Sequence, residues 1–192
     1  KIFYKSVCIT LNAATNFIGR YGALASHIAE YQNENEQRNN LEEVSVVCKR
    51  LSENPPETFR EALQSVWFLF VILHMESNAS SFSPGRMDQY LYRFFINDLQ
   101  SGTINHGNAV ELIDTLFIKF NQIVYMRNGH SAKYFAGFPI GFNITIGGQD
   151  KDGGDASNEL SYMFLKAQDH IRLPQPNLTA RLHKNSPYQF LD

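Results

Sequence analysis

Cysteine is scarce in this sequence, and charge of neither sign predominates. Only two cysteines, Cys8 and Cys48, occur among 192 residues, and they form neither a CxxC pair nor a zinc-ligand spacing. Free, buried thiols in a reducing cytoplasm are therefore expected rather than a disulfide framework. The 17 basic and 19 acidic residues give a formal net charge of −2, so the chain lacks the basic excess of nucleic-acid-binding proteins.

Long apolar runs and targeting segments are also missing. The longest apolar run, at residues 66–73, is far shorter than the ~20 residues of a membrane-spanning helix and predicts a buried helix instead. No apolar segment with a cleavage site follows the N-terminus, so a cytoplasmic protein without membrane contact is expected. The chain lacks a first Met and stays apolar up to residues 189–192, which favours a piece of a longer chain.

The apolar residues that are present predict helices over most of residues 1–130. Stripes of three- and four-residue spacing run through residues 2–31 and, more briefly, through residues 41–51. The polar residues 32–40 between them are expected at a helix end or turn. A third helix is expected over residues 57–76.

Three finer expectations concern the middle of the chain. Because the third helix is apolar on every face, Trp67 and Phe68 are expected to be almost completely buried. Ser83-Pro84-Gly85-Arg86 predicts a turn, and Asp88 is a plausible N-cap for a helix over residues 89–99. Asn108 is expected to open the next helix.

The apolar period changes to two in the last third of the chain. Alternating apolar residues predict strands at residues 142–147 and 178–183, with a helix over residues 156–170 between them. We therefore expect a helix-rich α/β fold, helical over residues 1–130 and strand-containing over residues 131–192.

Few residues stand out as a chemical site. The Gly- and Asp-rich segment at residues 147–155 fits neither a phosphate loop nor a calcium loop and is expected to be a plain turn. The six histidines include no pair three or four residues apart, so no helical metal site is predicted. Arg172, Arg181 and His183 could bind an anion, although ordinary surface charges are favoured.

The densest polar segment, residues 76–90, directly follows the most apolar helix. Its many hydrogen-bonding groups could line the site of a polar substrate. They could equally form a network that ends the helix and fixes the following turn. The residues alone leave these two interpretations equal.

Two blocks of this sequence resemble the pyruvate formate-lyase-like group of glycyl radical enzymes. The first runs from Pro56 to Tyr92 and contains Glu76-Ser77-Asn78, Ser83-Pro84-Gly85-Arg86 and Asp88-Gln89-Tyr90. The second contains Tyr134-Phe135-Ala136-Gly137-Phe138-Pro139, Gly147-Gly148, Asn158-Glu159-Leu160-Ser161 and Leu173-Pro174-Gln175-Pro176-Asn177-Leu178. The resemblance covers essentially the whole chain and is nearest to the glycerol and diol dehydratase branch.

The resemblance implies that the chain is a partial segment of a ten-stranded α/β barrel. In that family a radical-SAM activating enzyme installs a radical on a backbone glycine, and a cysteine passes it to a small-molecule substrate. The implied reaction is radical cleavage of a C–C, C–O or C–N bond, as in formate acetyltransferase-like or dehydratase-like enzymes. A homodimeric, cytoplasmic parent enzyme is also implied.

This sequence departs from the family pattern at the residues that carry the chemistry. Neither Cys8 nor Cys48 lies in the family's active-cysteine motif, and the radical-glycine loop is absent, so the isolated chain is expected to be inactive. A His-Ser pair of dehydratase members falls on Ser80 and Ser81. Ser81, Ser80 and Phe138 are the expected substrate-lining residues, and a non-catalytic helical binding module of the same ancestry is the alternative.

Overall fold

The computed structural model describes residues 1–77, 81–123, 128–135 and 141–191. The chain divides into two compact units, Lys1–Glu57 and Thr58–Asp192. Each unit is described separately below.

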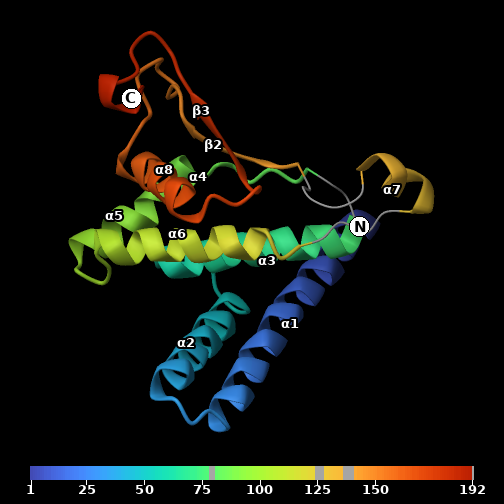
Figure 1. Ribbon diagram of the computed structural model, residues 1–192. Helices are drawn as coiled ribbons and strands as arrows, with labels where there is room; N and C mark the ends of the chain where they lie inside the picture. The colour runs from blue at the N-terminus through green and yellow to red at the C-terminus, as the bar shows by residue number, and fades with distance from the viewer. Residues whose placement is uncertain (78–80, 124–127, 136–140, 192) are drawn as a thin grey trace. The chain divides into compact units, whose positions relative to one another are not determined.

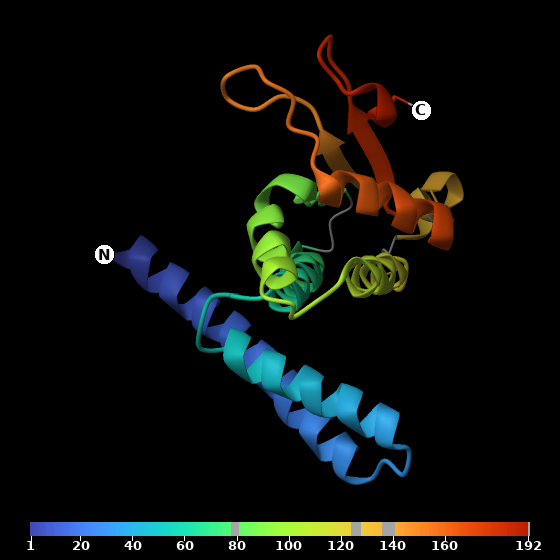
Figure 2. The same ribbon diagram turned by 90° about the vertical axis from the view of Figure 1, so that its left-hand side faces the viewer.

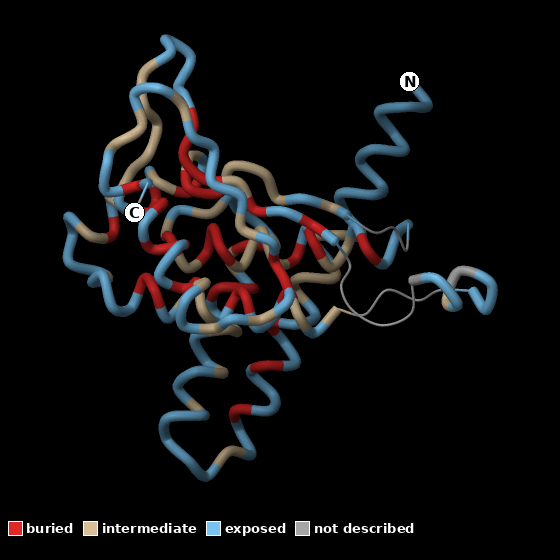
Figure 3. The backbone as a smooth tube through the Cα atoms, turned by 45° about the horizontal axis from the view of Figure 1, so that its top comes forward, coloured by how far each residue is buried: buried red, intermediate tan, exposed pale blue. Residues whose placement is uncertain are grey.

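The first unit is a helical hairpin of α1 (Ile2–Glu30) and α2 (Asn35–Leu51). Its buried residues are few, as the short red stretches in Figure 3 show. On α1 they are the small residues Gly22, Ala25 and Ala29, and a Cβ added at Gly22 would lie 3.2 Å from Cys48 Cβ. Small residues thus allow the two helices to approach closely.

The structure corrects two expectations about this hairpin. The polar residues 35–40 are helical, because α2 begins at Asn35 rather than at the first apolar residue of its stripe. Cys48 is buried as expected, whereas Cys8 is exposed. Cys8 therefore does not pack as a small core residue.

The second unit packs helices against one side of a small sheet. Its longer helices are α3 (Phe59–Ser77), α5 (Tyr92–Gln100), α6 (His106–Phe120) and α8 (Glu159–Ile171). The shorter helices are α4 (Met87–Tyr90), α7 (Gly129–Phe135) and the 3-10 turn η1 (Tyr188–Phe190). Figures 1 and 2 show α3 and α6 side by side, with α8 between them and the strands.

The sheet contains three parallel strands in the order β1-β2-β3. The two predicted strands are found as β2 (Asn143–Gly147) and β3 (Asn177–Arg181), although residues 142, 182 and 183 lie outside them. Most of residues 1–130 is helical as expected. The sequence did not predict β1 (Gly85–Arg86), which pairs Gly85 with Ile144. Two residues are too few to show alternation, and the positive φ of Gly85, +78°, matches the turn that was expected there.

Aromatic and aliphatic side chains fill the space between helices and sheet. Phe142, Ile144 and Ile146 are fully buried from the strand side, facing Phe117, Phe120 and Phe164 of the helices in one continuous core. Phe70 of α3 lies at the centre of an aromatic group, 4.7 Å from the ring of Phe120 and 4.8 Å from that of Phe142. Burial of this group fixes α3 and α6 against β2.

Of the two α3 residues that were expected to be almost completely buried, only one is. Phe68 is 4% exposed, but Trp67 is only partly buried. Leu69 and Leu73 are exposed on the same helix, so α3 keeps one apolar face open within this chain. Trp67 packs against the core without being fully covered, so the expectation of almost complete burial was wrong for this residue.

Helix starts also differ from those predicted. Helix α6 begins at His106, two residues before the predicted start at Asn108, because Asn105 is the N-cap and Asn108 is the third helical residue of a capping box. Asp88 is not an N-cap: it lies inside α4, fully buried. Its polar partners are described below.

Candidate functional site

The two faces of the sheet differ in character. Ile144, Ile146 and Leu178 point toward the helices and join the core. Alternation along the strands places Asn143, Thr145 and the residues paired with them on the opposite face. The members of this polar face are Asn143, Thr145, Asn177 and Thr179, all exposed or half-buried.

A polar face is unusual on a parallel sheet, because such sheets are normally apolar and covered on both sides. The amide and hydroxyl groups here can donate and accept hydrogen bonds. We define these four residues as the polar face of the sheet. It is a surface suited to a polar ligand or to other polar parts of the protein.

The segment before β1 reaches the beginning of this face. Ser81 is exposed and has a left-handed backbone conformation, with φ +69°, which few residues other than glycine adopt. Its Oγ lies 3.8 Å from the place that a Cβ on Gly141 would occupy. Ser83 Oγ accepts a 3.0 Å hydrogen bond from the backbone N–H of Asn143. Ser81 is therefore held where β2 begins.

Of the residues expected to line a substrate site, the structure places only Ser81. Ser80 and Phe138 lie outside the described residues, so their role remains a prediction. Ser81 meets the chemical requirement of that role, because its exposed hydroxyl can both donate and accept.

His74 lies beside this segment on the last turn of α3. Its ring centroid is 4.3 Å from that of Phe70 and 5.2 Å, edge-on, from that of Phe82. Nδ1 is 2.7 Å from the carbonyl oxygen of Phe70, and the side chain is 9% exposed. From the sequence, His74 on its apolar helix is expected to be a satisfied core or pocket residue rather than a metal ligand, and the structure does bury its side chain.

Asp88 forms hydrogen bonds at the other end of β2 from Ser81. Its buried carboxylate accepts hydrogen bonds from the backbone N–H of Gly147 at 2.7 Å and from Ser161 Oγ at 2.6 Å. Its backbone carbonyl accepts a third, from Asn158 Nδ2. The carboxylate thereby joins α4 to the end of β2 and to the start of α8.

Arg86 completes this arrangement from β1. Its guanidinium donates to the carbonyl oxygens of Gly147 and Gln149, at 2.7 and 3.0 Å. Within the following loop, Asp150 accepts from the backbone N–H groups of Asp152 and Gly154. The loop's carboxylates thus serve its own turns, which agrees with the plain-turn prediction.

The three residues weighed as an anion site do not act as one group of free cations. Arg172 pairs with Asp169 at 2.5 Å on the surface. His183 lies 3.0 Å from Asp155. Arg181 packs its side chain over Gly148. Ordinary structural and surface contacts account for all three.

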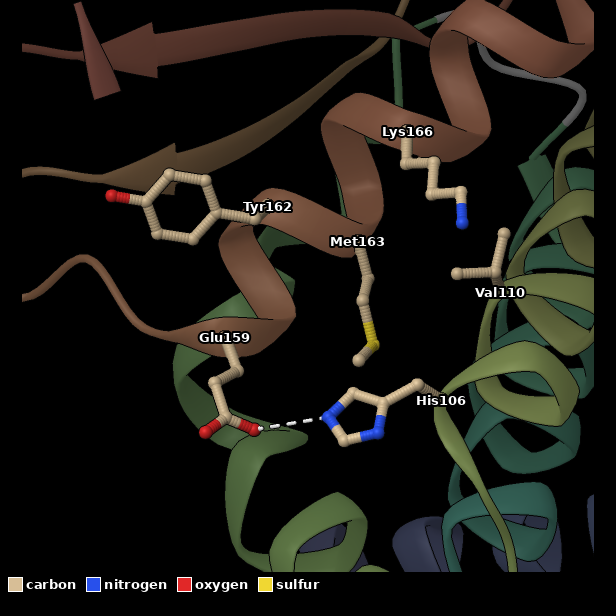
Figure 4. Close-up of a pocket in the computed structure, with 6 residues that line it drawn as sticks. All are labelled: His106, Val110, Glu159, Tyr162, Met163 and Lys166. Carbon is tan, nitrogen blue, oxygen red and sulfur yellow. Dashed lines mark ion pairs between the residues drawn. The ribbon is translucent and has the colours of Figure 1, made fainter. Parts of the chain in front are cut away.

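A separate hollow of about 300 Å³ lies between α6 and α8 (Figure 4). Val110 and Met163 supply apolar walls, and His106 pairs with Glu159 at 3.6 Å across its mouth. Lys166 also lines the hollow, so both an acidic and a basic side chain border it.

Neither a metal site nor a membrane-spanning helix is found in the part of the chain that the structure describes. Within the four described ranges, no three His, Cys, Asp or Glu side chains gather where a metal ion could be held. No helix in those ranges combines the length and apolar character that crossing a bilayer requires.

Comparisons with known proteins agree with the resemblance seen in the sequence. A family model described as "Pyruvate formate lyase-like" matches residues 1–192. The (2S)-3-sulfopropanediol dehydratase of Klebsiella oxytoca is 36% identical over 97% of this chain and 23% of its own length. This chain thus spans about a quarter of that relative.

Two solved structures match closely. The glycerol-bound, B12-independent glycerol dehydratase from Clostridium butyricum has a TM-score of 0.89 at 39% identity, over 94% of this chain and 22% of that one. A structure describing 1,2-propanediol dehydration in Roseburia inulinivorans has a TM-score of 0.95 at 38% identity, over 98% and 24%. The helix-rich α/β fold is therefore part of a much larger barrel.

Proposed function

From its membership of the pyruvate formate lyase-like family, to which this chain belongs, we propose that it is a segment of a glycyl radical enzyme. The proposed enzyme eliminates water or a similar group from a small hydroxylated metabolite. The observation that carries the proposal is the match of nearly the whole chain to dehydratases at 36–39% identity. The comparisons lend no support to a formate acetyltransferase reaction. Cleavage of a C–O bond is therefore preferred over cleavage of a C–C or C–N bond.

The chain's own contribution is to bind and orient the substrate. Ser81 offers a hydroxyl at the start of β2, and the polar face of the sheet extends from there. Substrate hydroxyl groups lose their hydrogen bonds to water on binding, and the side chains of Ser81 and the polar face can supply new hydrogen bonds in their place. The aromatic residues behind β2 keep water from the opposite side.

No described residue has the sequence motif of the family's reactive cysteine or of its radical-storing glycine. Burial between α1 and α2 raises the pKa of the Cys48 thiol to about 11. Cys8 lies exposed on α1. Both thiols belong to the first unit, whereas Ser81 and the polar face belong to the second, and neither thiol lies in the family's active-cysteine motif, so we assign no radical step to this chain. The storage glycine and the reactive cysteine belong to the rest of the proposed enzyme.

The proposed partners follow from the same chemistry. A radical-SAM activating enzyme would install the radical on the complete protein, a homodimer in the cytoplasm. The substrate is a small polar molecule with at least one hydroxyl group.

The proposal is tested on the complete enzyme, activated anaerobically with its activating enzyme and S-adenosylmethionine. We expect a glycyl radical doublet by EPR and aldehyde or ketone products from 1,2-propanediol, glycerol or a related diol. An enzyme that forms no radical and no product would instead support the non-catalytic alternative.

Ser81→Ala tests the residue assigned to this chain. Loss of one neutral hydrogen bond should raise KM by about 2- to 12-fold. Ser6→Ala is the matched control, because Ser6 is exposed and its hydroxyl donates to the carbonyl of Ile2 in its own helix. Unchanged KM and kcat/KM in Ser81→Ala would remove Ser81 from the site.

A further inference from the structure

His183 lies in the turn that follows β3, and both of its ring nitrogens have hydrogen-bond partners. Nδ1 is 3.3 Å from the backbone nitrogen of Asn185, and Nε2 is 3.0 Å from Oδ1 of Asp155. A backbone N–H can only donate, so Nδ1 carries no proton and accepts this hydrogen bond. In the neutral ring the proton is therefore on Nε2, which donates to the Asp155 carboxylate.

The imidazole joins the turn after β3 to the loop after β2, both of which extend from the same end of the sheet (Figure 1). The side chain of His183 is 10% exposed and that of Asp155 19%. Asp155 is fixed in its own loop, because its carboxylate accepts from the backbone N–H and the hydroxyl of Ser157. The turn is closed by two further hydrogen bonds, from the N–H of His183 to Ser186 Oγ and from the N–H of Ser186 to the carbonyl oxygen of His183.

Asp155 is the charged group bound to the ring in the part of the chain that the structure describes. The other charged side chains of the two segments and of the adjoining end of β3 are Asp150, Lys151, Asp152, Arg181 and Lys184. Asp150 accepts from backbone N–H groups of its own loop, and Arg181 packs over Gly148. The charge of Asp155 is therefore the one that the ring meets directly, and it favours a protonated imidazole.

Protonation would change the hydrogen bonding on one side of the ring only. An imidazolium carries a proton on each nitrogen, so Nε2 still donates to Asp155 in a charge-assisted hydrogen bond. The new Nδ1–H faces the N–H of Asn185, and two donors cannot form a hydrogen bond with each other. Acid thus removes the acceptor of the Asn185 N–H and preserves the link between the two segments.

A second contact holds the same segment without involving charge. Phe190 of η1 is buried, and its ring meets that of Tyr162 edge-on at a centroid distance of 5.6 Å. The Phe190 ring also lies so close to Gly147 that a Cβ there would be 2.6 Å from Cε1. Residues 188–191 are therefore anchored at the end of β2 independently of His183.

We propose that His183 is a pH-sensitive switch of the turn at residues 183–186. The turn is closed while Nδ1 carries no proton and opens when Nδ1 is protonated, and Asp155 and Phe190 keep the segment attached in both states. Histidine is the side chain that ordinarily changes charge between about pH 5 and 8, so the switch operates in that range. The inference concerns this turn and does not depend on the proposed reaction.

The test is hydrogen exchange of the complete enzyme before activation, at pH 5 and pH 8. Mass spectrometry with fragmentation that resolves single amides follows the exchange, and each rate is corrected for the intrinsic exchange rate at that pH. Peptides from α6 show whether each protein is folded under both conditions.

Two substitutions separate the two hydrogen bonds of the ring. His183→Asn places an oxygen near the position of Nδ1, so it can accept from Asn185 but does not reach Asp155. His183→Gln places an amide N–H near the position of Nε2, so it can donate to Asp155 but offers no acceptor to Asn185. His27→Gln is the control, because His27 is an exposed histidine on α1.

We expect the corrected exchange of the Asn185 amide to be about 2- to 12-fold faster at pH 5 than at pH 8 in the wild type and in His27→Gln, the effect of one neutral hydrogen bond. His183→Asn should exchange slowly at both pH values, and His183→Gln rapidly at both. Residues 188–191 should keep their protection in every protein.

Three results would overturn the inference. One is equal corrected exchange of the Asn185 amide at the two pH values in the wild type. Another is a pH response of wild-type size in His183→Asn or His183→Gln, because a group other than His183 would then cause it. The third is loss of protection at residues 188–191 in acid, which would mean that the whole segment detaches rather than the turn alone.

Discussion

At the residue scale, the most constrained polar group in the second unit is the carboxylate of Asp88. The sequence suggested only a helix cap, because Asp before an apolar stripe is a common N-cap. The structure instead buries Asp88 completely and gives it donors from Gly147 and Ser161, residues 59 and 73 positions away. Sequence patterns report local neighbours, so contacts over such separations could not be predicted from them.

Asp88→Ala should destabilise the complete enzyme by about 2–5 kcal/mol, because two buried donors lose their acceptor. Asp88→Asn keeps one acceptor oxygen and should cost less. Urea unfolding measures both, with Asp152→Ala as an exposed control expected within about 0.5 kcal/mol of wild type. An Asp88→Ala enzyme as stable as the control would show that the network contributes little.

The two cysteines should differ sharply in reactivity. Alkylation requires the thiolate, and burial raises the Cys48 pKa from 9.0 to about 11. Iodoacetamide at pH 8 should therefore modify exposed Cys8 and spare Cys48, as peptide mass spectrometry would show. Equal modification of both in the folded protein would contradict the buried position of Cys48.

The same pKa shift predicts a pH dependence of stability. The folded pKa exceeds the unfolded value, so the contribution of the neutral thiol is fully present below about pH 9 and is lost as pH rises toward 11. Cys48→Ala should remove that part of the alkaline destabilisation, measured by urea unfolding between pH 8 and 11.

At the element scale, apolar periodicity identified the long helices and both longer strands. The helix expected over residues 57–76 is α3 (Phe59–Ser77), and the change to a period of two located β2 and β3. Burial within an element was harder to predict. How deeply Trp67 and Phe70 are buried depends on the positions of β2 and α6, and the sequence of α3 alone does not specify those positions.

The two rings of α3 should therefore differ in their contribution to stability. Phe70→Ala removes a ring that contacts Phe120 and Phe142 and should cost about 3–5 kcal/mol. Trp67→Ala, at a partly buried position, should cost less. Thermal unfolding of the complete enzyme compares them, and a larger loss for Trp67→Ala would contradict the packing described here.

At the scale of the whole molecule, this chain is a quarter of its relatives and exposes apolar surface within its own helices. Leu69 is 58% exposed and Leu73 44% on α3. The family resemblance predicted the family and the helix-rich α/β fold. It could not predict which buried groups meet around Asp88, because those contacts join residues far apart in the sequence.

The isolated 192-residue chain should be catalytically inert and prone to self-association. No described thiol suits the radical relay, and exposed apolar residues and open strand edges favour aggregation. Light scattering should show oligomers, whereas anaerobic treatment with activating enzyme should yield no EPR doublet. A carbon-centred radical on this chain alone would refute the inactivity.

The parallel pairing of the strands also sets an order for folding during synthesis. Gly85 pairs with Ile144, and Asn143 pairs with Asn177, so β1 and β2 each pair with a strand that is synthesised later. At about 5–20 residues per second, roughly 5–20 s separate the synthesis of β1 from that of the end of β3. The α1–α2 hairpin, whose contacts are local, can form well before that time. Until β2 has been synthesised, β1 and the segment holding Ser81 have no strand to pair with, and the growing chain depends on its helices for early structure.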